Sequence, residues 1–260
     1  MNPLELPAEL LSRIEDAGLN ASAPPQQRWV DGWIVRFSPG KAQRARCINA
    51  VAPGRLSLAE KLAYCQALYR AVGLPLLFRI TPFSQPQALD DGLAQRGYQR
   101  IEDSRVMVCP ALLLHAAVAA PEGTRFEDVD MEAYAHIVGR FRGTPLAGRQ
   151  AHAERLQHSP VPYRGAVLRA ADGEVLACAQ SAIEADLVGL YDVFTEPRSR
   201  GLGLSRGLCA HLLEQARKQG ARTAYLQVDA ANHAARAMYH QLGFADGHAY
   251  HYRALPSVAT

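Results

Sequence analysis

The chain has 260 residues, of which 48% are hydrophobic, 20% charged and 7% aromatic, a composition typical of a globular protein. It excludes the disordered and fibrous classes. The formal net charge of +3 provides no broad electrostatic attraction to nucleic acid, so no nucleic-acid partner is expected.

The cysteines and the apolar segments indicate a reduced, cytoplasmic protein. Five scattered cysteines without a CxxC pair suggest neither a disulfide framework nor a zinc knuckle. Residues 1–6 lack the basic-then-apolar order of a signal peptide. The most apolar stretch, Val106 to Ala120, is interrupted by Pro110 and His115 and is shorter than the roughly 18 residues of a membrane span. No membrane segment is therefore expected.

The first half of the chain predicts alternating helices and strands. Its clearest signal is Ser57 followed by Glu60, a capping box that starts a helix, with Gly73 as its natural stop. The predicted elements are, in chain order, a helix around 10–14, strands at 32–37 and 46–51, the helix after residue 57, a strand at 76–81, a helix at 87–95 and a strand at 105–109.

The second half repeats this order of elements. We predict a loop at 197–203, a helix from 204 to a stop at Gly220, a strand at 223–229 and a helix at 234–242. Gly73 and Gly97 are 24 positions apart, and Gly220 and Gly243 are 23 apart, so the halves also match in spacing. The alanine-rich segment from Pro110 to Gly123 separates two predicted domains, 1–120 and 121–260.

Only the second copy retains polar groups that could carry chemistry. An offset of 147 residues sets Gly54 opposite Gly201. The first half has Val51 and Leu56 where the second half has Arg198 and Gly203. Beyond a one-residue gap, it has Leu93 where the second half has Tyr239. The first copy is therefore expected to be degenerate.

The segment from Tyr191 to Arg206 reads as a strand, a turn and the start of a helix. Gly201 and Gly203 remove side chains that would block a ligand, and they leave the N–H groups of a helix N-terminus pointing outward. This pattern predicts a pyrophosphate site, although a glycine turn with solvated arginines is the simpler alternative. The arginines around the loop are Arg198, Arg200 and Arg206.

A dinucleotide-binding fold is one rival interpretation of this loop. Asp229 follows at the end of the next strand and could bind a ribose. The run from Gly201 to Gly207 misses the third glycine of that fingerprint by one position, however, and too few residues follow for the further strands and helices of such a domain.

The segment from Arg198 to Gly203 resembles the R/Q-x-x-G-x-G/A signature of the GNAT superfamily of acyl-CoA-dependent N-acyltransferases. The region from Leu226 to Phe244, with Asn232, Ala235 and Tyr239, resembles the second signature of that family. The resemblance covers roughly residues 124–253. It implies an α/β fold of the acyl-CoA N-acyltransferase type with a mixed sheet, in two tandem domains: a degenerate one at 1–120 and a catalytic one at 121–260.

The resemblance also implies acetyl-CoA as cosubstrate, without a metal. The residues that it assigns to the cofactor are Val193, Phe194, Thr195, Arg198, Ser199, Arg200, Gly201, Leu202, Gly203, Leu204, Ser205, Asn232, Ala235 and Tyr239. Asn232 also stands where a helix N-cap is wanted, and Ser205 is equally explained as a first-turn polar residue.

Acyl transfer to an amine requires a base and an acid. Because only about one alkyl amine in a few thousand is neutral at pH 7, a base should matter, and Asp192 is the first candidate, ahead of Glu184 and Asp186. The alternative for each is a solvated carboxylate at a strand end. The resemblance gives Tyr239 the role of protonating the thiolate, and gives the backbone of 193–195 that of binding the thioester oxygen.

Two other groups of residues predict no chemistry. Cys209 lies on the apolar side of a helix and is interpreted as a core residue. His248 and His251 would point to opposite faces of a strand, so a shared metal ion is not expected.

We therefore expect an N-acetyltransferase that acts by direct attack of a primary amine on acetyl-CoA. A non-catalytic acyl-CoA sensor is the alternative, and an interaction scaffold would need neither Arg198 nor the glycines. The acceptor, whose pocket would involve 141–149, could be a small amine, an amino acid, an antibiotic, or a protein N-terminus or lysine. We expect the first domain to form one wall of the acceptor cleft, a role that a second subunit would otherwise have. This expectation favours a monomer.

Overall fold

The computed structural model describes residues 6–38, 42–112 and 119–256. The expectations drawn from residues 1–5, and from the part of the linker at 113–118, lie outside this range. The chain forms two compact units: unit 1 comprises Met1–Ala21, Val106–Val228 and Asn232–Gly247, and unit 2 comprises Ser22–Arg105, Asp229–Ala231 and His248–Thr260. The units interleave along the chain, so no single cut between residues 120 and 121 separates them.

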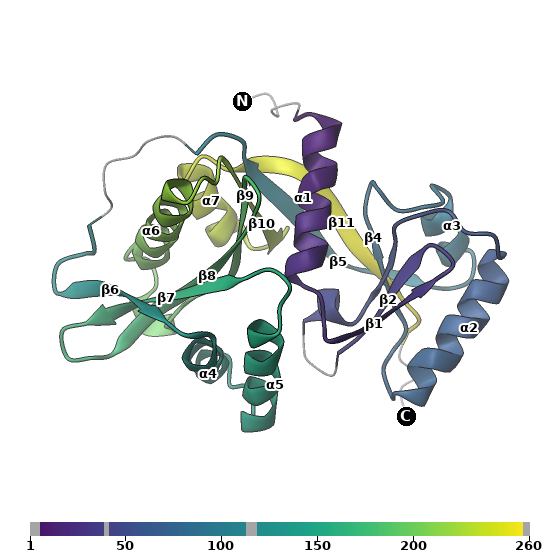
Figure 1. Ribbon diagram of the computed structural model, residues 1–260, viewed down its shortest axis with the longest axis horizontal. Coiled ribbons are helices and arrows are strands. Elements are labelled where there is room, and N and C mark those ends of the chain that lie inside the picture. Colours follow the sequence, from purple (N-terminus) through teal and green to yellow (C-terminus); the bar gives the residue numbers. More distant parts are fainter. Residues whose placement is uncertain (1–5, 39–41, 113–118, 257–260) are drawn as a thin grey trace. The chain divides into compact units, whose positions relative to one another are not determined.

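Unit 1 is a mixed sheet with helices on both faces (Figure 1). The strands are hydrogen-bonded in the order β5-β10-β9-β8-β7-β6, antiparallel from β6 to β9 and parallel between β9 and β10. The elements are α1 (Ala8–Ala21), β6 (Thr124–Val129), α4 (Met131–Phe141), α5 (Leu146–Gln157), β7 (Tyr163–Ala170), β8 (Val175–Glu184), β9 (Leu187–Thr195), a 3-10 turn (Pro197–Ser199), α6 (Leu204–Lys218), β10 (Thr223–Asp229) and α7 (His233–Gln241), with parts of β5 (Gln99–Cys109) and β11 (Ala245–Ala254).

Alternating side chains on the strands divide the core of unit 1 into two layers. Val167 and Cys178 pack in one cluster with residues of α4 and α5. Their neighbours Ala166, Leu168 and Ala177 pack in another with residues of α6. Successive side chains of a strand point to opposite faces, so α4 and α5 cover one face of the sheet and α6 covers the other.

Strand β9 is irregular at its centre. Its pairing with β8 shifts register between Cys178 and Gln180, and Asp192 on β9 has a φ of 48°. The parallel pairing of β9 with β10 runs from Leu187 to Leu190, although β9 continues to Thr195. The second half of β9 therefore leaves its parallel neighbour.

Unit 2 repeats the arrangement of strands on a smaller scale. Its elements are β1 (Gln26–Val30), β2 (Trp33–Phe37), a 3-10 turn (Gln43–Ala45), β3 (Ile48–Ala50), α2 (Leu58–Ala71), β4 (Leu77–Ile80) and α3 (Leu89–Ala94), with the remaining parts of β5 and β11. β1, β2 and β3 are antiparallel, β4 is parallel to β3, and β11 follows β4. Thus α2 connects two parallel strands just as α6 does in unit 1, which supports the predicted repeat. That unit 2 is a degenerate copy stays a prediction.

The start of α2 follows the sequence signal. Ser57 caps the helix by accepting from the backbone N–H of Glu60, whose side chain in turn accepts from the N–H of Ser57. The core beneath is aromatic: the rings of Trp33 and Phe78 meet edge to face at 5.5 Å, and those of Phe78 and Tyr98 at 5.6 Å. The capping-box prediction is confirmed.

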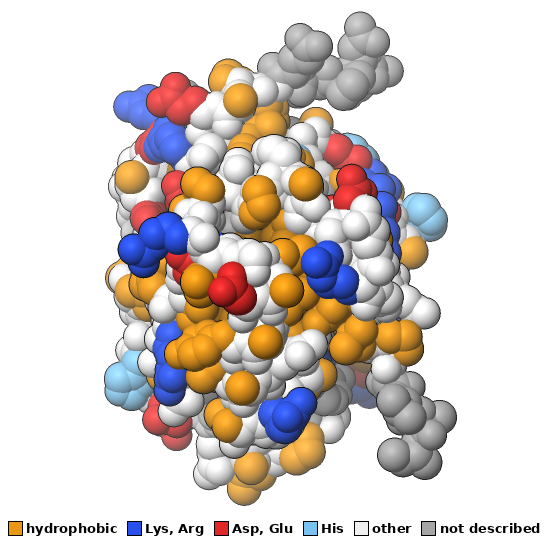
Figure 2. Space-filling model, turned by 90° about the vertical axis from the view of Figure 1, so that its right-hand side faces the viewer, with side chains coloured by type: hydrophobic (Ala, Val, Ile, Leu, Met, Phe, Trp, Pro, Cys, Tyr) orange, Lys and Arg blue, Asp and Glu red, His pale blue; other side chains and the backbone are white. Residues whose placement is uncertain are grey.

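On the face in Figure 2, basic and acidic side chains are interspersed around hydrophobic ones, and no single sign of charge dominates. All five cysteines are buried and free. None of the helices in the described ranges is long and apolar enough to cross a membrane.

Candidate active site

A cavity of about 830 Å³ opens in unit 1 between the end of β9, the loop after it and α7. Its volume is in the range of small-molecule and cofactor sites. The predicted cofactor residues that line it are Val193, Phe194, Thr195, Ser199, Arg200, Gly201, Leu202, Gly203, Leu204, Ser205, Asn232, Ala235 and Tyr239. The lining residues that were not assigned to the cofactor are Arg206, Ala234, Ala237, Met238 and Gln241.

The glycine loop forms one end of this cavity. Gly201 has a φ of 80° and Gly203, the N-cap of α6, a φ of 72°, a left-handed conformation that favours glycine. A Cβ built on Gly201 would meet nothing within 4 Å, and one on Gly203 only the Arg206 Nη2 at 3.8 Å. The space in front of both residues is open. The first turn of α6 carries no acidic residue, so its N–H groups keep their attraction for an anion.

Two of the three arginines predicted at the loop line the cavity. Arg206 donates to Gln241 Oε1 at 2.9 Å, and the Arg200 guanidinium lies 5.6 Å from the centre of the Phe194 ring. Arg198 does not line it: its side chain is 65% exposed and forms ion pairs with Glu174 and Glu196. The positive charge at the cavity therefore comes from Arg200 and Arg206.

Helix α7 supplies the other wall. Tyr239 is 6% exposed, and burial, with Cys209 nearby, raises the pKa of its phenol well above the usual value. It therefore stays protonated at neutral pH and can donate a hydrogen bond. Asn232 accepts a hydrogen bond from the backbone N–H of Ala235 at 3.1 Å, which caps α7. It also lines the cavity, so it caps the helix and borders the cavity at the same time.

Ser205 and Thr195 connect the two sides of the loop. Their hydroxyl groups are hydrogen-bonded to each other and both line the cavity. Because Ser205 lies in the first turn of α6 and Thr195 ends β9, this contact fixes the strand end against the helix start.

Asp192 is held in a polar cluster on the sheet face covered by α4 and α5. Its Oδ1 accepts from Arg142 at 2.8 Å, and its Oδ2 accepts from Gln180 at 2.9 Å and lies 3.4 Å from Nε2 of His152. Burial alone would raise its pKa, but the hydrogen bond from His152 and the charges of Arg142, His152 and Arg155 outweigh it and hold the pKa well below the usual range. Asp192 does not line the cavity.

The other two acids weighed as bases serve structural contacts in unit 1. Glu184 accepts from Asn20 of α1 at 2.8 Å, and Asp186 forms an ion pair with Arg13 of the same helix. Neither lines the cavity. The contacts of His152 and Arg142 with Asp192 were not predicted, because they arise only when α4 and α5 pack on the sheet.

The described residues offer no cluster for a metal ion: no group of three or more His, Cys, Asp or Glu side chains comes together among them. Of the two histidines considered above, His251 lies 3.0 Å from Asp90 and His248 meets the ring of Phe83 edge to face, all within unit 2.

Comparison with known proteins identifies the family. Residues 11–253 match the family described as "Probable histone acetyltransferase Rv0428c C-terminal", and the chain belongs to this family of GNAT acetyltransferases. It is an acyltransferase with the N-acetyltransferase activity of its relatives in general. The predictions of the superfamily and of the mixed α/β fold are confirmed.

Individual relatives agree with this assignment. The chain is 24% identical to the uncharacterized N-acetyltransferase YobR of Bacillus subtilis over 233 residues, 87% of this chain and 91% of that protein. It is 36% identical over 73 residues to the [ribosomal protein bS18]-alanine N-acetyltransferase of Escherichia coli K12, a match that spans 28% of this chain and 49% of that protein.

Solved structures share the fold. A GCN5-related N-acetyltransferase from Kribbella flavida aligns with a TM-score of 0.70 at 18% identity, over 99% of this chain and 97% of that one. A tandem GNAT protein from the clavulanic acid biosynthesis pathway aligns with a TM-score of 0.62 at 16% identity, over 75% and 68%.

Proposed function

We propose that this enzyme transfers an acetyl group from acetyl-CoA to a primary amine by direct attack. The observation that carries the proposal is that one cavity of unit 1 is lined by an open glycine loop, by a strand that has left its parallel neighbour and by a buried phenol. These are the groups that a pyrophosphate, a thioester and a departing thiolate require.

Each part of acetyl-CoA has candidate partners in this chain. The pyrophosphate would accept from the backbone N–H groups at Gly201, Gly203 and the start of α6, beside Arg200 and Arg206. The pantetheine arm would follow the backbone of 193–195, with the Asn232 amide within the same cavity. The backbone N–H groups of that strand are candidates for binding the thioester oxygen as it gains negative charge.

The chemical step needs two proton transfers. The neutral amine attacks the thioester carbon, a C–N bond forms, the C–S bond breaks and the thiolate leaves. Tyr239 gives its phenolic proton to the sulfur, the excess proton on the nitrogen passes to a base or to water, and a proton from solvent then restores the phenol. Tyr239 also argues against the alternative of a non-catalytic acyl-CoA sensor, which has no use for a proton donor beside the sulfur.

The role of Asp192 as that base stays a prediction, and the surroundings of Asp192 argue against it. A carboxylate whose pKa lies far below the usual range has little affinity for a proton. We propose instead that Asp192 is a positioning residue, which holds the irregular turn of β9 through Arg142 and His152.

The two roles of Asp192 differ in the pH dependence of Asp192→Asn. With a folded pKa this low, Asp192 is ionised throughout the range from about pH 6 to about pH 9. We expect the ratio of wild-type to variant kcat to stay constant across that range. A ratio that falls steadily as pH rises, because hydroxide replaces a lost base, would establish Asp192 as the base.

The arginines provide a paired test of the cofactor site. Arg206→Ala should raise the Kd for acetyl-CoA about tenfold, the loss of one partly exposed charge-assisted contact of about 1.4 kcal/mol. Arg198→Ala, which removes the same charge from outside the cavity, should change it less than about twofold. Calorimetric titration measures both, and equal weakening by the two variants would contradict the assignment.

We propose a monomeric cytoplasmic enzyme whose acceptor is an amine of a protein or a small molecule. One relative is named for acetylation of an alanine of a ribosomal protein, and the family is described by a histone acetyltransferase. The test is a panel of peptides with free N-termini, lysine peptides, amino acids and aminoglycosides, with release of the CoA thiol as readout. Equal amounts of thiol and N-acetyl product, without an acetylated enzyme by mass spectrometry, are expected. Binding of acetyl-CoA without thiol release for the whole panel would favour the sensor.

A further inference from the structure

Unit 2 contains a second strand, loop and helix of the kind that forms the cavity in unit 1. Strand β3 ends at Ala50, the loop from 51 to 57 follows, and α2 begins at Leu58. As in unit 1, the helix leads to a strand parallel to the first. Gly54 in this loop occupies the position of Gly201 in the sequence repeat.

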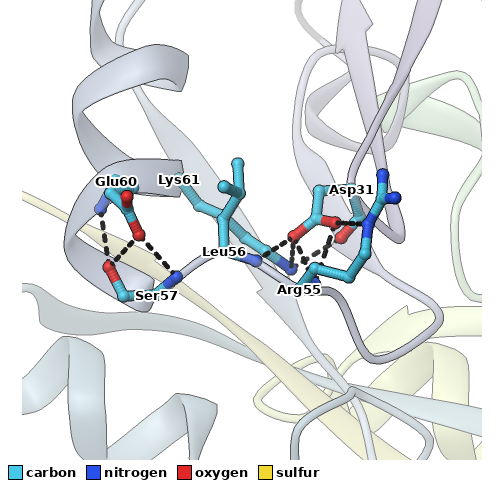
Figure 3. A network of polar contacts seen from close by, with 6 residues as sticks. All are labelled: Asp31, Arg55, Leu56, Ser57, Glu60 and Lys61. Carbon is cyan, nitrogen blue, oxygen red and sulfur yellow. Dashed lines mark hydrogen bonds and ion pairs between the residues drawn. The ribbon is translucent and has the colours of Figure 1, made fainter.

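The backbone N–H groups of this loop already bind an anion, the carboxylate of Asp31 (Figure 3). The N–H of Arg55 lies 2.9 Å from each carboxylate oxygen, and the N–H of Leu56 donates to Oδ2 at 2.9 Å. The Lys61 ammonium completes the arrangement, 3.1 Å from Oδ2 and 2.6 Å from the backbone oxygen of Asp31.

The site around Asp31 is closed. The side chains of Lys61 and Asp31 are 3% and 9% exposed, and the Lys61 Nζ lies 4.8 Å from the centre of the Trp33 ring. A Cβ on Gly54 would lie 2.1 Å from both Asp31 Oδ2 and Lys61 Nζ. The same construction on Gly201 meets nothing within 4 Å. One loop is thus filled and the other open.

The turn between β1 and β2 positions the Asp31 carboxylate at the loop. Asp31 has a φ of 43° and Gly32 a φ of 87°, so the turn adopts a left-handed backbone. Gly32 lies against the loop: its carbonyl accepts from the N–H of Ala52 at 3.0 Å, and a Cβ would come within 2.4 Å of the Ala52 oxygen. The N–H groups of Arg55 and Leu56 lower the pKa of Asp31, which keeps it ionised.

We propose that Asp31 is a built-in anion that occupies the phosphate-binding position of unit 2, so that unit 2 keeps the anion-binding loop but takes no acyl-CoA there. The inference rests on the proposed function only where it equates this loop with the pyrophosphate loop of unit 1. It predicts that an exogenous carboxylate can replace the Asp31 side chain.

Asp31→Gly tests the proposal by chemical rescue, because glycine accepts the left-handed backbone and removes only the anion. We expect Tm to fall by about 5 °C or more, and sodium formate to restore at least about half of that loss relative to sodium chloride at equal ionic strength. Wild type should show no difference between the two salts. If Asp31→Gly does not fold alone, refolding in formate should recover soluble protein and refolding in chloride should not.

Ser57→Ala is the matched control, since it weakens the same end of α2 by removing the capping hydroxyl but leaves Asp31 in place. Formate should not restore its Tm. A formate effect on Asp31→Gly no larger than on Ser57→Ala would overturn the proposal, as would binding of a second acetyl-CoA by wild type. The rescue does not require acetyl-CoA, so its failure is distinguishable from failure of the proposed function, which would be absence of any acetyl-CoA binding by wild type.

Discussion

Gly203→Glu is expected to abolish binding of acetyl-CoA, raising its Kd at least about 100-fold. Gly203 is the N-cap of α6, and the space in front of it is open. A glutamate would fill that space and place a negative charge at the helix N-terminus where we propose that the pyrophosphate binds. Calorimetric titration measures the loss directly.

Gly220→Glu is the control that separates this effect from backbone strain. Gly220 follows the other end of α6, has a φ of 102° and meets nothing within 4 Å of an added Cβ. Both variants therefore carry a left-handed glutamate, at a cost of about 1–2 kcal/mol in stability. Only Gly203→Glu should lose the ligand. Retained affinity would mean that the phosphates bind elsewhere.

Tyr239→Phe is expected to lower kcat about 100-fold with the Kd for acetyl-CoA nearly unchanged. The phenyl ring keeps the packing against Phe244, at 5.9 Å between ring centres, and only the proton donor is lost. Because burial raises the pKa of Tyr239, the wild-type phenol stays protonated from about pH 6 to about pH 9. The loss of kcat should therefore be similar throughout that range.

Tyr69→Phe controls for the removal of a buried hydroxyl. Tyr69, in unit 2, is fully buried and donates to the backbone oxygen of Arg36 at 2.9 Å. Its loss should lower Tm and leave kcat unchanged. If Tyr239→Phe also turned over at the wild-type rate across the pH range, Tyr239 would have no role as the acid.

Local signals located the glycine loop and the elements around it. The strand predicted at 223–229 is β10 with the same bounds, and the capping box at Ser57 starts α2 as expected. These features depend on neighbours in the chain, such as glycine stops, caps and short apolar runs. Of the 18 residues that line the cavity, the family resemblance had assigned 13 to the cofactor.

The rest depends on contacts between residues distant in the chain. Helix α5 has few apolar residues and no periodic apolar face that would mark it, yet it brings His152 to Asp192. Arg198 matches the signature, but its side chain forms an ion pair with Glu174, in the turn between β7 and β8, and does not line the cavity. The carboxylate of Asp31 meets Arg55 only because the turn after β1 packs on the loop before α2. No local pattern in the sequence predicts contacts of this kind between distant residues.

We propose that this chain binds one acyl-CoA, in unit 1. Calorimetric titration of the wild-type protein with acetyl-CoA, CoA and NAD tests it most directly, before any acceptor is known. We predict saturable binding of acetyl-CoA and CoA at one site per chain and no binding of NAD. Two acetyl-CoA sites, binding of NAD in place of CoA, or no binding at all would contradict this proposal.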